Sequence, residues 1–345
     1  PNFRERFGPR GVIHSYADGR IEDTGPLTKK RMETVDDEII HEAQRFIKDA
    51  AYGDTPFFVW FNTTGMHFRT HIADEIRGQA GRWQSEYHDA MVEHDKRIGS
   101  MLDLLDELGL AEDTIVVYST DNGVHMNTWP DAGMTPFRNE KNSSWEGAFR
   151  VPALVRWPDK IEAGIVLNDI VSHGDWFPTF LAAAGAPDIC EELQAGKDLN
   201  GTQYKVHLDG YNQLQYLTGE TDKSEREHFF YVSDDGDLMA LRFSNWKILF
   251  LEQRAEGTLR VWAEPFTELR VPKIFNLRTD PFERADITSN TYYDWMISHA
   301  YLLVPAQAYV LQMAASLVEF PPRQESSSFN VSAMLDKLRA GISSS

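Results

Sequence analysis

Residues 114–123 read Thr-Ile-Val-Val-Tyr-Ser-Thr-Asp-Asn-Gly and are the most informative positions of this chain. The β-branched and aromatic run at 114–119 is typical of a short strand that is buried on both faces. Asp121 and Asn122 follow it at once. In an open parallel sheet, ligands bind outside the carboxyl ends of the strands, so these two side chains are candidates for a functional site.

Other segments extend this pattern in both directions. Similar apolar runs at 56–61 and 151–156 predict two more buried strands. Amphipathic repeats over 35–47 and 85–108 predict helices. Helices that alternate with buried strands are typical of an α/β fold with a largely parallel sheet flanked by helices. We predict such a domain over residues 1–215.

The pattern changes after residue 216. Short strand-like runs begin at Phe229, Leu238 and Trp246, and turn-forming residues such as Gly236 separate them. Strands at this close spacing indicate an antiparallel sheet, on which a helical stretch near the end of the chain is expected to pack. We therefore predict a smaller α+β subdomain over residues 216–345.

Composition narrows the classes of partner. The chain has 345 residues, of which 34 are basic and 53 acidic, giving a formal net charge of −19. Such a chain repels polyanions, so nucleic acid is not an expected partner. The apolar stretch at 300–320 contains proline and glutamine, which predicts a buried helix and no membrane span. Cys190 is the single cysteine, so no internal disulfide forms. The compartment stays open between periplasm and cytoplasm, and so does the oligomeric state.

Asp121 and Asn122 place one anionic and one neutral oxygen ligand side by side. A hard divalent cation such as Ca²⁺ prefers that set of ligands, usually with further carboxylates from elsewhere in the chain. The pair also has a simpler interpretation, because Asn-Gly after a strand is a common turn and needs no metal.

Two further residues are candidates for binding or proton transfer. Lys141 carries a charge that could hold a tetrahedral oxyanion. His67 follows the strand predicted at 56–61, and its imidazole could act as a general acid or bind an anion. From the pattern alone, a solvated loop lysine and an ordinary hydrogen-bonded histidine are the simpler interpretations.

Several motifs point to one family when they are taken together. Residues 118–123 read Tyr-Ser-Thr-Asp-Asn-Gly, and residues 141–152 read Lys-Asn-Ser-Ser-Trp-Glu-Gly-Ala-Phe-Arg-Val-Pro. Later stretches are Asp-Trp-Phe-Pro-Thr at 175–179, Phe-Asn-Leu-Arg-Thr-Asp-Pro-Phe-Glu at 275–283 and Phe-Pro-Pro-Arg-Gln at 320–324. These motifs resemble the sulfatases of the alkaline phosphatase superfamily, in particular bacterial arylsulfatases, over nearly the whole chain. The resemblance implies an alkaline phosphatase-like fold and metal-assisted hydrolysis of a sulfate monoester.

The resemblance also implies roles for single residues. Asp121 and Asn122 match the later pair of calcium ligands in the family. Lys141 matches a lysine that contacts the sulfate group. His67 matches a histidine near the leaving-group oxygen, and Arg150 matches an arginine for which we expect a structural role.

The chain departs from the family pattern at the nucleophile. In the family, a C-x-P/A-x-R signature supplies a cysteine that is converted to formylglycine, whereas Cys190 is followed by Glu-Glu-Leu-Gln. Two earlier aspartate ligands of the family also have no counterpart. The resemblance therefore implies a C-terminal fragment with an incomplete Ca²⁺ site, inactive alone, and with formylglycine expected upstream.

Two alternatives remain at this stage. A phosphonate or phosphate ester hydrolase could use the same scaffold, because a lysine and a metal bind different tetrahedral oxyanions alike. A non-catalytic, degenerate homologue would also account for the missing nucleophile.

Overall fold

The structure is a computed structural model that describes residues 2–3, 6 and 11–323. Gln324, the last residue of the motif at 320–324, and the rest of the predicted subdomain up to residue 345 lie outside them. The chain divides into two compact units. Unit 1 comprises Pro1–Val116 and Asn127–Met134, and unit 2 comprises Val117–Met126 and Thr135–Ser345. The domain boundary predicted at residues 215 and 216 stays a prediction.

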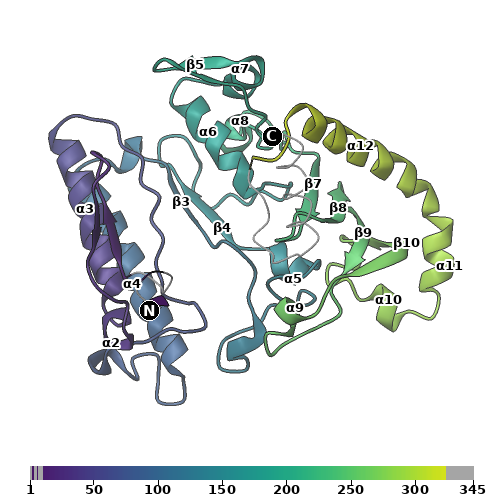
Figure 1. Cartoon of the computed structure of the whole chain (residues 1–345), viewed down its shortest axis with the longest axis horizontal. Coiled ribbons are helices and arrows are strands. Elements are labelled where there is room, and N and C mark those ends of the chain that lie inside the picture. The colour runs from purple at the N-terminus through teal and green to yellow at the C-terminus, as the bar shows by residue number, and fades with distance from the viewer. Residues whose placement is uncertain (1, 4–5, 7–10, 324–345) are drawn as a thin grey trace. The chain divides into compact units, whose positions relative to one another are not determined.

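Unit 1 is built around two long helices, α3 (Val35–Tyr52) and α4 (Glu86–Glu107), which lie side by side (Figure 1). They correspond to the helices predicted at 35–47 and 85–108. Ile47 of α3 packs against Leu104 and Leu105 of α4 in a small apolar core. The short elements of this part of the chain are an antiparallel hairpin of β1 (Ile13–Ser15) and β2 (Ile21–Asp23), helix α2 (Lys29–Met32), and the 3₁₀ turns η1 (Asp74–Ile76), η2 (Ala111–Asp113) and η3 (Met126–Thr128).

The strand predicted at 56–61 is not found, because this segment belongs to no strand in the described part of the chain. Phe57 and Val59 pack against the core between α3 and α4, whereas Phe58 and Trp60 are 68% and 81% exposed. The segment therefore has one covered face, and the prediction of burial on both faces is wrong. A continuous apolar run does not reveal whether a second layer covers its outer face.

The other two predicted strands lie in unit 2, except for Val116, the first residue of β3 (Val116–Ser119), which belongs to unit 1. The run at 114–119 forms β3, which pairs with β4 (Ala153–Arg156). Between them lies a loop-rich segment that ends in the short helix α5 (Glu146–Phe149). After β4 come η4 (His173–Asp175), α6 (Trp176–Ala183), α7 (Ile189–Ala195), the hairpin of β5 (Lys197–Leu199) and β6 (Thr202–Tyr204), and α8 (Leu214–Leu217). This mixture of helices and strands is the predicted α/β class.

The C-terminal part of unit 2 is a four-stranded antiparallel sheet in the order β10-β9-β8-β7 (Figure 1). The strands are β7 (His228–Val232), β8 (Leu238–Phe243), β9 (Trp246–Glu252) and β10 (Thr267–Asn276). The helical elements around them are α9 (Arg260–Ala263), α10 (Ala285–Thr288), α11 (Tyr292–Ser298), η5 (Ala300–Leu302) and α12 (Leu303–Glu319). The prediction of an antiparallel sheet with helices after residue 216 is confirmed.

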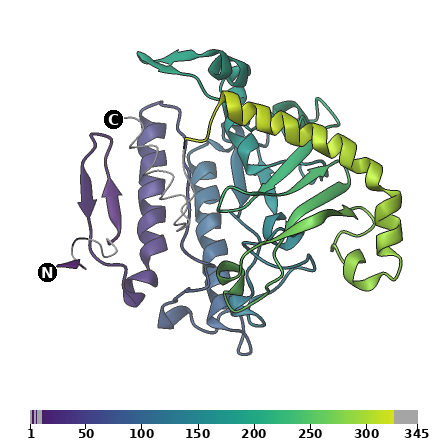
Figure 2. The same ribbon diagram turned by 45° about the vertical axis from the view of Figure 1, so that its right-hand side comes forward.

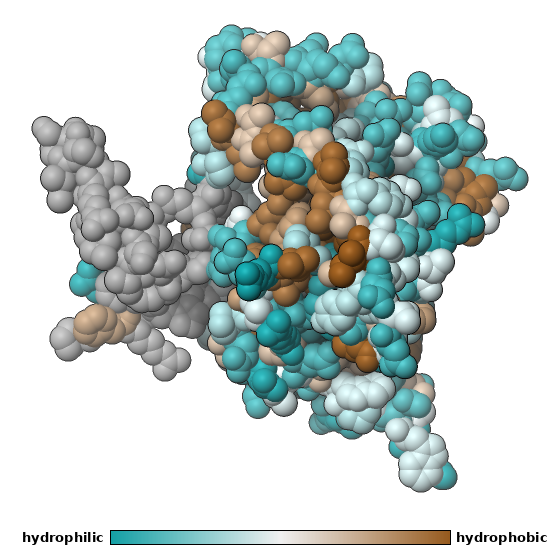
Figure 3. All heavy atoms as spheres, turned by 90° about the vertical axis from the view of Figure 1, so that its right-hand side faces the viewer, coloured by the Kyte–Doolittle hydropathy of each residue, from teal (hydrophilic) through white to brown (hydrophobic). Residues whose placement is uncertain are grey.

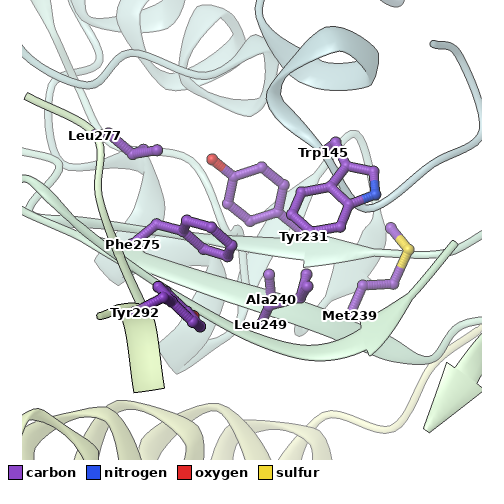
Figure 4. Packing of buried hydrophobic residues seen from close by; sticks show 8 residues of the cluster. All are labelled: Trp145, Tyr231, Met239, Ala240, Leu249, Phe275, Leu277 and Tyr292. Carbon is purple, nitrogen blue, oxygen red and sulfur yellow. The ribbon is translucent and has the colours of Figure 1, made fainter. Parts of the chain in front are cut away.

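Each face of this sheet has its own apolar core. On one face, Leu241, Ile248 and Ile274 pack against α12, which runs along the sheet in Figure 2. On the other face, Leu249 and its neighbours pack against the fully buried Trp145, as Figure 4 shows. Because Trp145 directly precedes α5, the C-terminal sheet holds the loop-rich segment between β3 and β4 in place.

Helix α12 differs from the buried helix that its composition predicts. Only 11% of the most apolar part of Ala300–Glu319 is buried, since the helix turns one narrow side toward the sheet. Val304 and Leu311 are 72% and 61% exposed, and apolar surface runs across the face that carries α11 and α12 (Figure 3). Among the described helices, this one is long and apolar enough to cross a membrane by length and composition, which for a single helix is weak evidence of a span.

Candidate functional site

Asp121 and Asn122 lie in the loop that leaves β3. The loop runs against α5, because Gly123 N donates to Ala148 O over 2.7 Å. A Cβ atom on Gly123 would lie 1.9 Å from the carbonyl oxygen of Gly147, so only glycine fits there. Glycine at position 123 is therefore required by a close approach of two backbone segments, and this approach fixes the loop at the end of β3.

The side-chain oxygens of this pair suit a hard cation. Asn122 Nδ2 donates to Gly123 O over 2.9 Å, and Asp121 Oδ1 lies 3.4 Å from Thr120 Oγ1. One carboxylate and one amide oxygen are the ligand types that Ca²⁺ takes, but Ca²⁺ needs about six to eight oxygens. Within the described residues, no group of three or more His, Cys, Asp or Glu side chains could hold a metal ion. The pair fits part of a Ca²⁺ site, and its metal-binding role stays a prediction.

Lys141 lies on the segment next to this loop. Its backbone N–H donates to Val124 O over 2.8 Å. Asn139 and Asn142 flank it with φ angles of 61° and 63°, a backbone conformation that asparagine tolerates better than most residues. Their side-chain amides donate to backbone carbonyls in the segment 255–261 over 3.0 and 2.9 Å. The structure thus joins the segment of Lys141 to the Asp121–Asn122 loop on one side and to the C-terminal part on the other.

Trp145 and Arg138 anchor the two ends of the Lys141 segment. Trp145 Nε1 donates to Gln253 O over 3.0 Å, and the Arg138 guanidinium lies 3.5 Å from the centre of the Trp145 ring. Arg138 Nη1 also donates to Glu283 O and to Asp286 Oδ1, each over 2.8 Å. A cation–π contact and charge-assisted hydrogen bonds out of water are among the stronger contacts in proteins, so this segment is held firmly.

A buried ion cluster joins α5 to β9 and to the loop after β10. Lys247 Nζ lies 3.2 Å from Glu146 Oε1 and 2.7 Å from Glu283 Oε1, and all three side chains are almost fully buried. Burial raises the pKa of Glu283 to about 7, against the attraction of Lys247. Burial also acts to raise the pKa of Glu146, but Lys247 and the Tyr231 hydroxyl outweigh it and hold that pKa at about 2. The cluster therefore contains one firmly ionised carboxylate and one that takes up a proton near neutral pH.

His67 lies in unit 1, in a loop held by α3 and α4. The buried Asp36 of α3 accepts hydrogen bonds from the backbone N–H groups of residues 64–65 over 2.7 and 2.9 Å. Tyr87 of α4 donates its hydroxyl to Met66 O over 2.8 Å. These contacts fix the chain directly before His67. The prediction that His67 and Lys141 share one pocket stays a prediction, since the two residues belong to different units.

Comparison with known proteins identifies the family. Residues 7–186 match the sulfatase family, and residues 223–337 match the C-terminal region of aryl-sulfatase. The chain belongs to the sulfatase family. The resemblance inferred from the motifs is thereby confirmed, and with it the place of the chain in the alkaline phosphatase superfamily.

The relatives of this sulfatase chain are longer than the chain itself. Steryl-sulfatase of Mus musculus is 32% identical over 255 residues, which are 68% of this chain and 38% of the relative. N-acetylgalactosamine-6-sulfatase of Rattus norvegicus is 29% identical over 305 residues, which are 84% of this chain and 57% of the relative. The solved PsFucS1 sulfatase from Pseudoalteromonas sp. has a TM-score of 0.75 at 27% identity, covering 93% of this chain and 60% of that one. The chain thus has the sulfatase fold and spans less than two thirds of each relative.

Cys190 lacks the properties of a sulfatase nucleophile. It lies in α7, half-buried, with Sγ 3.8 Å from Gly210 O. Burial and the neighbouring Glu191 raise the pKa of its thiol. A raised pKa disfavours the reactive thiolate, which agrees with the absence of the family signature around this cysteine.

His173 is a residue of this region that sequence reasoning misses. Its Nε2 donates to Thr120 O over 2.8 Å, so the imidazole lies beside the residue that precedes Asp121. His173 belongs to η4, two residues before the motif at 175–179. That position is the only signal in the sequence, and no periodicity links it to the end of β3.

Proposed function

We propose that this chain carries the sulfate-binding part of a sulfatase site and serves the hydrolysis of a sulfate monoester. The observation that supports this most is the pair of backbone hydrogen bonds, Gly123 N to Ala148 O and Lys141 N to Val124 O. They join the loop of Asp121 and Asn122 to the segment of Lys141 within one compact unit.

Each residue has a distinct task in this proposal. With a net charge of −19, the chain attracts an anionic ester only through local positive charge, which Lys141 supplies. Asp121 and Asn122 would hold Ca²⁺, which supplies a positive charge that polarises the sulfate oxygens when it is bound. His67 would donate a proton to the leaving-group oxygen.

The nucleophile is proposed to come from polypeptide other than these 345 residues. Cys190 is the single cysteine and lies outside any C-x-P/A-x-R signature. Attack on sulfur requires an activated nucleophile, so the chain alone should bind a sulfate ester without hydrolysing it.

The substrate class that we propose is the sulfate monoesters. The names of the relatives include a steryl-sulfatase and an N-acetylgalactosamine-6-sulfatase. These two names have only the sulfate ester in common. The sulfate group is what Lys141 and a metal held by Asp121 and Asn122 would recognise.

The test is calorimetric titration of the chain with inorganic sulfate in the presence of Ca²⁺. Lys141→Ala should weaken sulfate binding by about tenfold or more, because it removes a charge-assisted contact. Lys160→Ala, which removes an exposed lysine of the same unit, is the matched control and should leave binding unchanged. Equal affinity of the wild type and Lys141→Ala would contradict the proposal. A parallel titration with inorganic phosphate tests the phosphate alternative, which tighter binding of phosphate would favour.

A further inference from the structure

Glu140, the residue before Lys141, has an unusual environment for a carboxylate. Its side chain is only 1% exposed. Oε2 accepts a hydrogen bond from Met126 N, and Oε1 accepts one from Gly257 N. In the part of the chain that the structure describes, no basic side chain forms an ion pair with it. Two backbone N–H groups therefore balance a charge that would be costly to bury alone.

The two N–H groups come from segments far apart in the sequence. Met126 ends the loop that begins with Asp121 and Asn122. Gly257 lies in the C-terminal part, between β9 and α9, with a φ angle of 70°. Glu140, the residue before Lys141, is thus hydrogen-bonded both to the loop of Asp121 and Asn122 and to the C-terminal segment.

The backbone around Glu140 is held in the same way. Asn139 Oδ1 accepts from Glu140 N over 2.8 Å, and Asn139 Nδ2 donates to Ala255 O over 3.0 Å. Lys141 N in turn donates to Val124 O. These contacts hold the peptide of Lys141 against the loop of Asp121 and against the segment at Ala255, and none of them uses the Lys141 ammonium group. Among the described residues, no side chain forms an ion pair with that group, which leaves it able to bind an anion.

We propose that Glu140 is a positioning residue for sulfate binding, which sets the location of Lys141 relative to Asp121 and Asn122. This inference rests on the proposed function, in which Lys141 contacts the sulfate group. Glu140 itself contacts neither substrate nor metal. It controls the affinity for sulfate through the backbone N–H groups of Met126 and Gly257, which it binds.

The informative substitution is Glu140→Gln, which keeps the shape of the side chain. A carboxylate accepts at both oxygens, whereas an amide accepts at one end and presents N–H groups at the other. One of the two N–H groups, of Met126 or Gly257, must then face a donor. The segments separate at that point, and Lys141 loses its fixed position.

Asp89→Asn is a matched control in unit 1. Asp89 is 2% exposed and accepts from the backbone N–H groups of Gly78 and Ala80 over 2.7 and 2.8 Å. The Asp89→Asn variant therefore loses the same kind of double contact, in the unit that does not contain Lys141, Asp121 and Asn122. A purely structural role for Glu140 would make the two variants alike in sulfate affinity.

The experiment measures thermal unfolding and calorimetric affinity for inorganic sulfate, with Ca²⁺ present, for the full chain and its variants. Glu140→Gln should weaken sulfate binding about tenfold, as expected for loss of a hydrogen bond to a charged group. Asp89→Asn should lower the unfolding temperature about as much as Glu140→Gln does. It should keep the wild-type affinity for sulfate. If Glu140→Gln does not fold, Asn139→Gly decides the question, because glycine keeps the positive φ and removes the amide that holds Glu140. It too should weaken sulfate binding.

The outcomes separate the inference from the proposed function. If Lys141→Ala weakens sulfate binding and both Glu140→Gln and Asn139→Gly bind like the wild type, the positioning role is wrong and the proposed function stands. If the wild type binds no sulfate, or Lys141→Ala has no effect, the proposed function itself fails.

Discussion

Gly123 and Gly147 meet backbone to backbone where the Asp121–Asn122 loop touches α5. A Cβ atom on Gly147 would lie 2.3 Å from the carbonyl oxygen of Arg138, and its N–H donates to that oxygen over 2.9 Å. Each glycine thus lets two parts of the site approach more closely than any side chain would allow. The sequence predicts a turn at Asn122-Gly123, but it does not reveal this approach, because the contacting residue lies far along the chain.

Replacing Gly123 tests this contact. Gly123→Ala should lower the free energy of unfolding by about 1–3 kcal/mol, the usual range for forcing an extra carbon into a packed site. Gly99→Ala is the control, since Gly99 lies within α4 with open space around it. That change should raise stability by up to about 1 kcal/mol, the difference in helix propensity. Urea denaturation measures both, and a Gly123→Ala protein as stable as the wild type would contradict the close approach.

The ion cluster of Glu146, Lys247 and Glu283 connects three elements, α5, β9 and the loop after β10. Its contribution to stability depends on pH through Glu283. The pKa of Glu283 rises from its ordinary value of 4.5 to about 7 because the carboxyl is buried. The folded protein therefore holds this proton more tightly than the unfolded chain does. The stability that it contributes is full below about pH 4.5 and is lost as the pH rises through about 7.

Glu283→Gln should remove this pH dependence. Relative to the variant, the wild type should lose unfolding free energy as the pH rises from about 5 to about 8. Glu146, with its pKa held at about 2, titrates below this window and does not interfere. Chemical denaturation of both proteins across the window gives the difference directly. Parallel stability curves would show that Glu283 keeps the same charge throughout.

The elements themselves differ in how well the sequence predicts them. Strands β7, β8 and β9 were predictable because tight turns separate them, as at Gly236 with its φ angle of 86°. The ion cluster around Lys247 was not predictable from the sequence. Its two carboxylates come from distant segments, and the sequence does not show that a lysine within a strand is buried. The prediction of a strand at 56–61 was wrong for a related reason. Its apolar composition is that of a strand, but Trp60 has no covering layer in the described residues.

At the scale of the whole molecule, the chain belongs to the sulfatase family and spans 38% to 60% of the relatives named above. The family was predictable because each of its motifs consists of consecutive residues, which can be recognised without knowing the fold. The prediction that His67 approaches Lys141 stays a prediction, since the two residues belong to different units. The sequence predicts Asp121, Asn122 and Lys141 as candidates for a site, but it does not reveal the hydrogen bonds that join their loops.

The most direct test is equilibrium dialysis of the full chain with an aryl sulfate and Ca²⁺, followed by assay of the released phenol. We predict that the ester binds, that Lys141→Ala abolishes most of this binding, and that no phenol is released. Binding without turnover is what a site with a sulfate-binding lysine and no nucleophile should give. Release of phenol that survives Cys190→Ala, or binding that is indifferent to Lys141, would contradict the account.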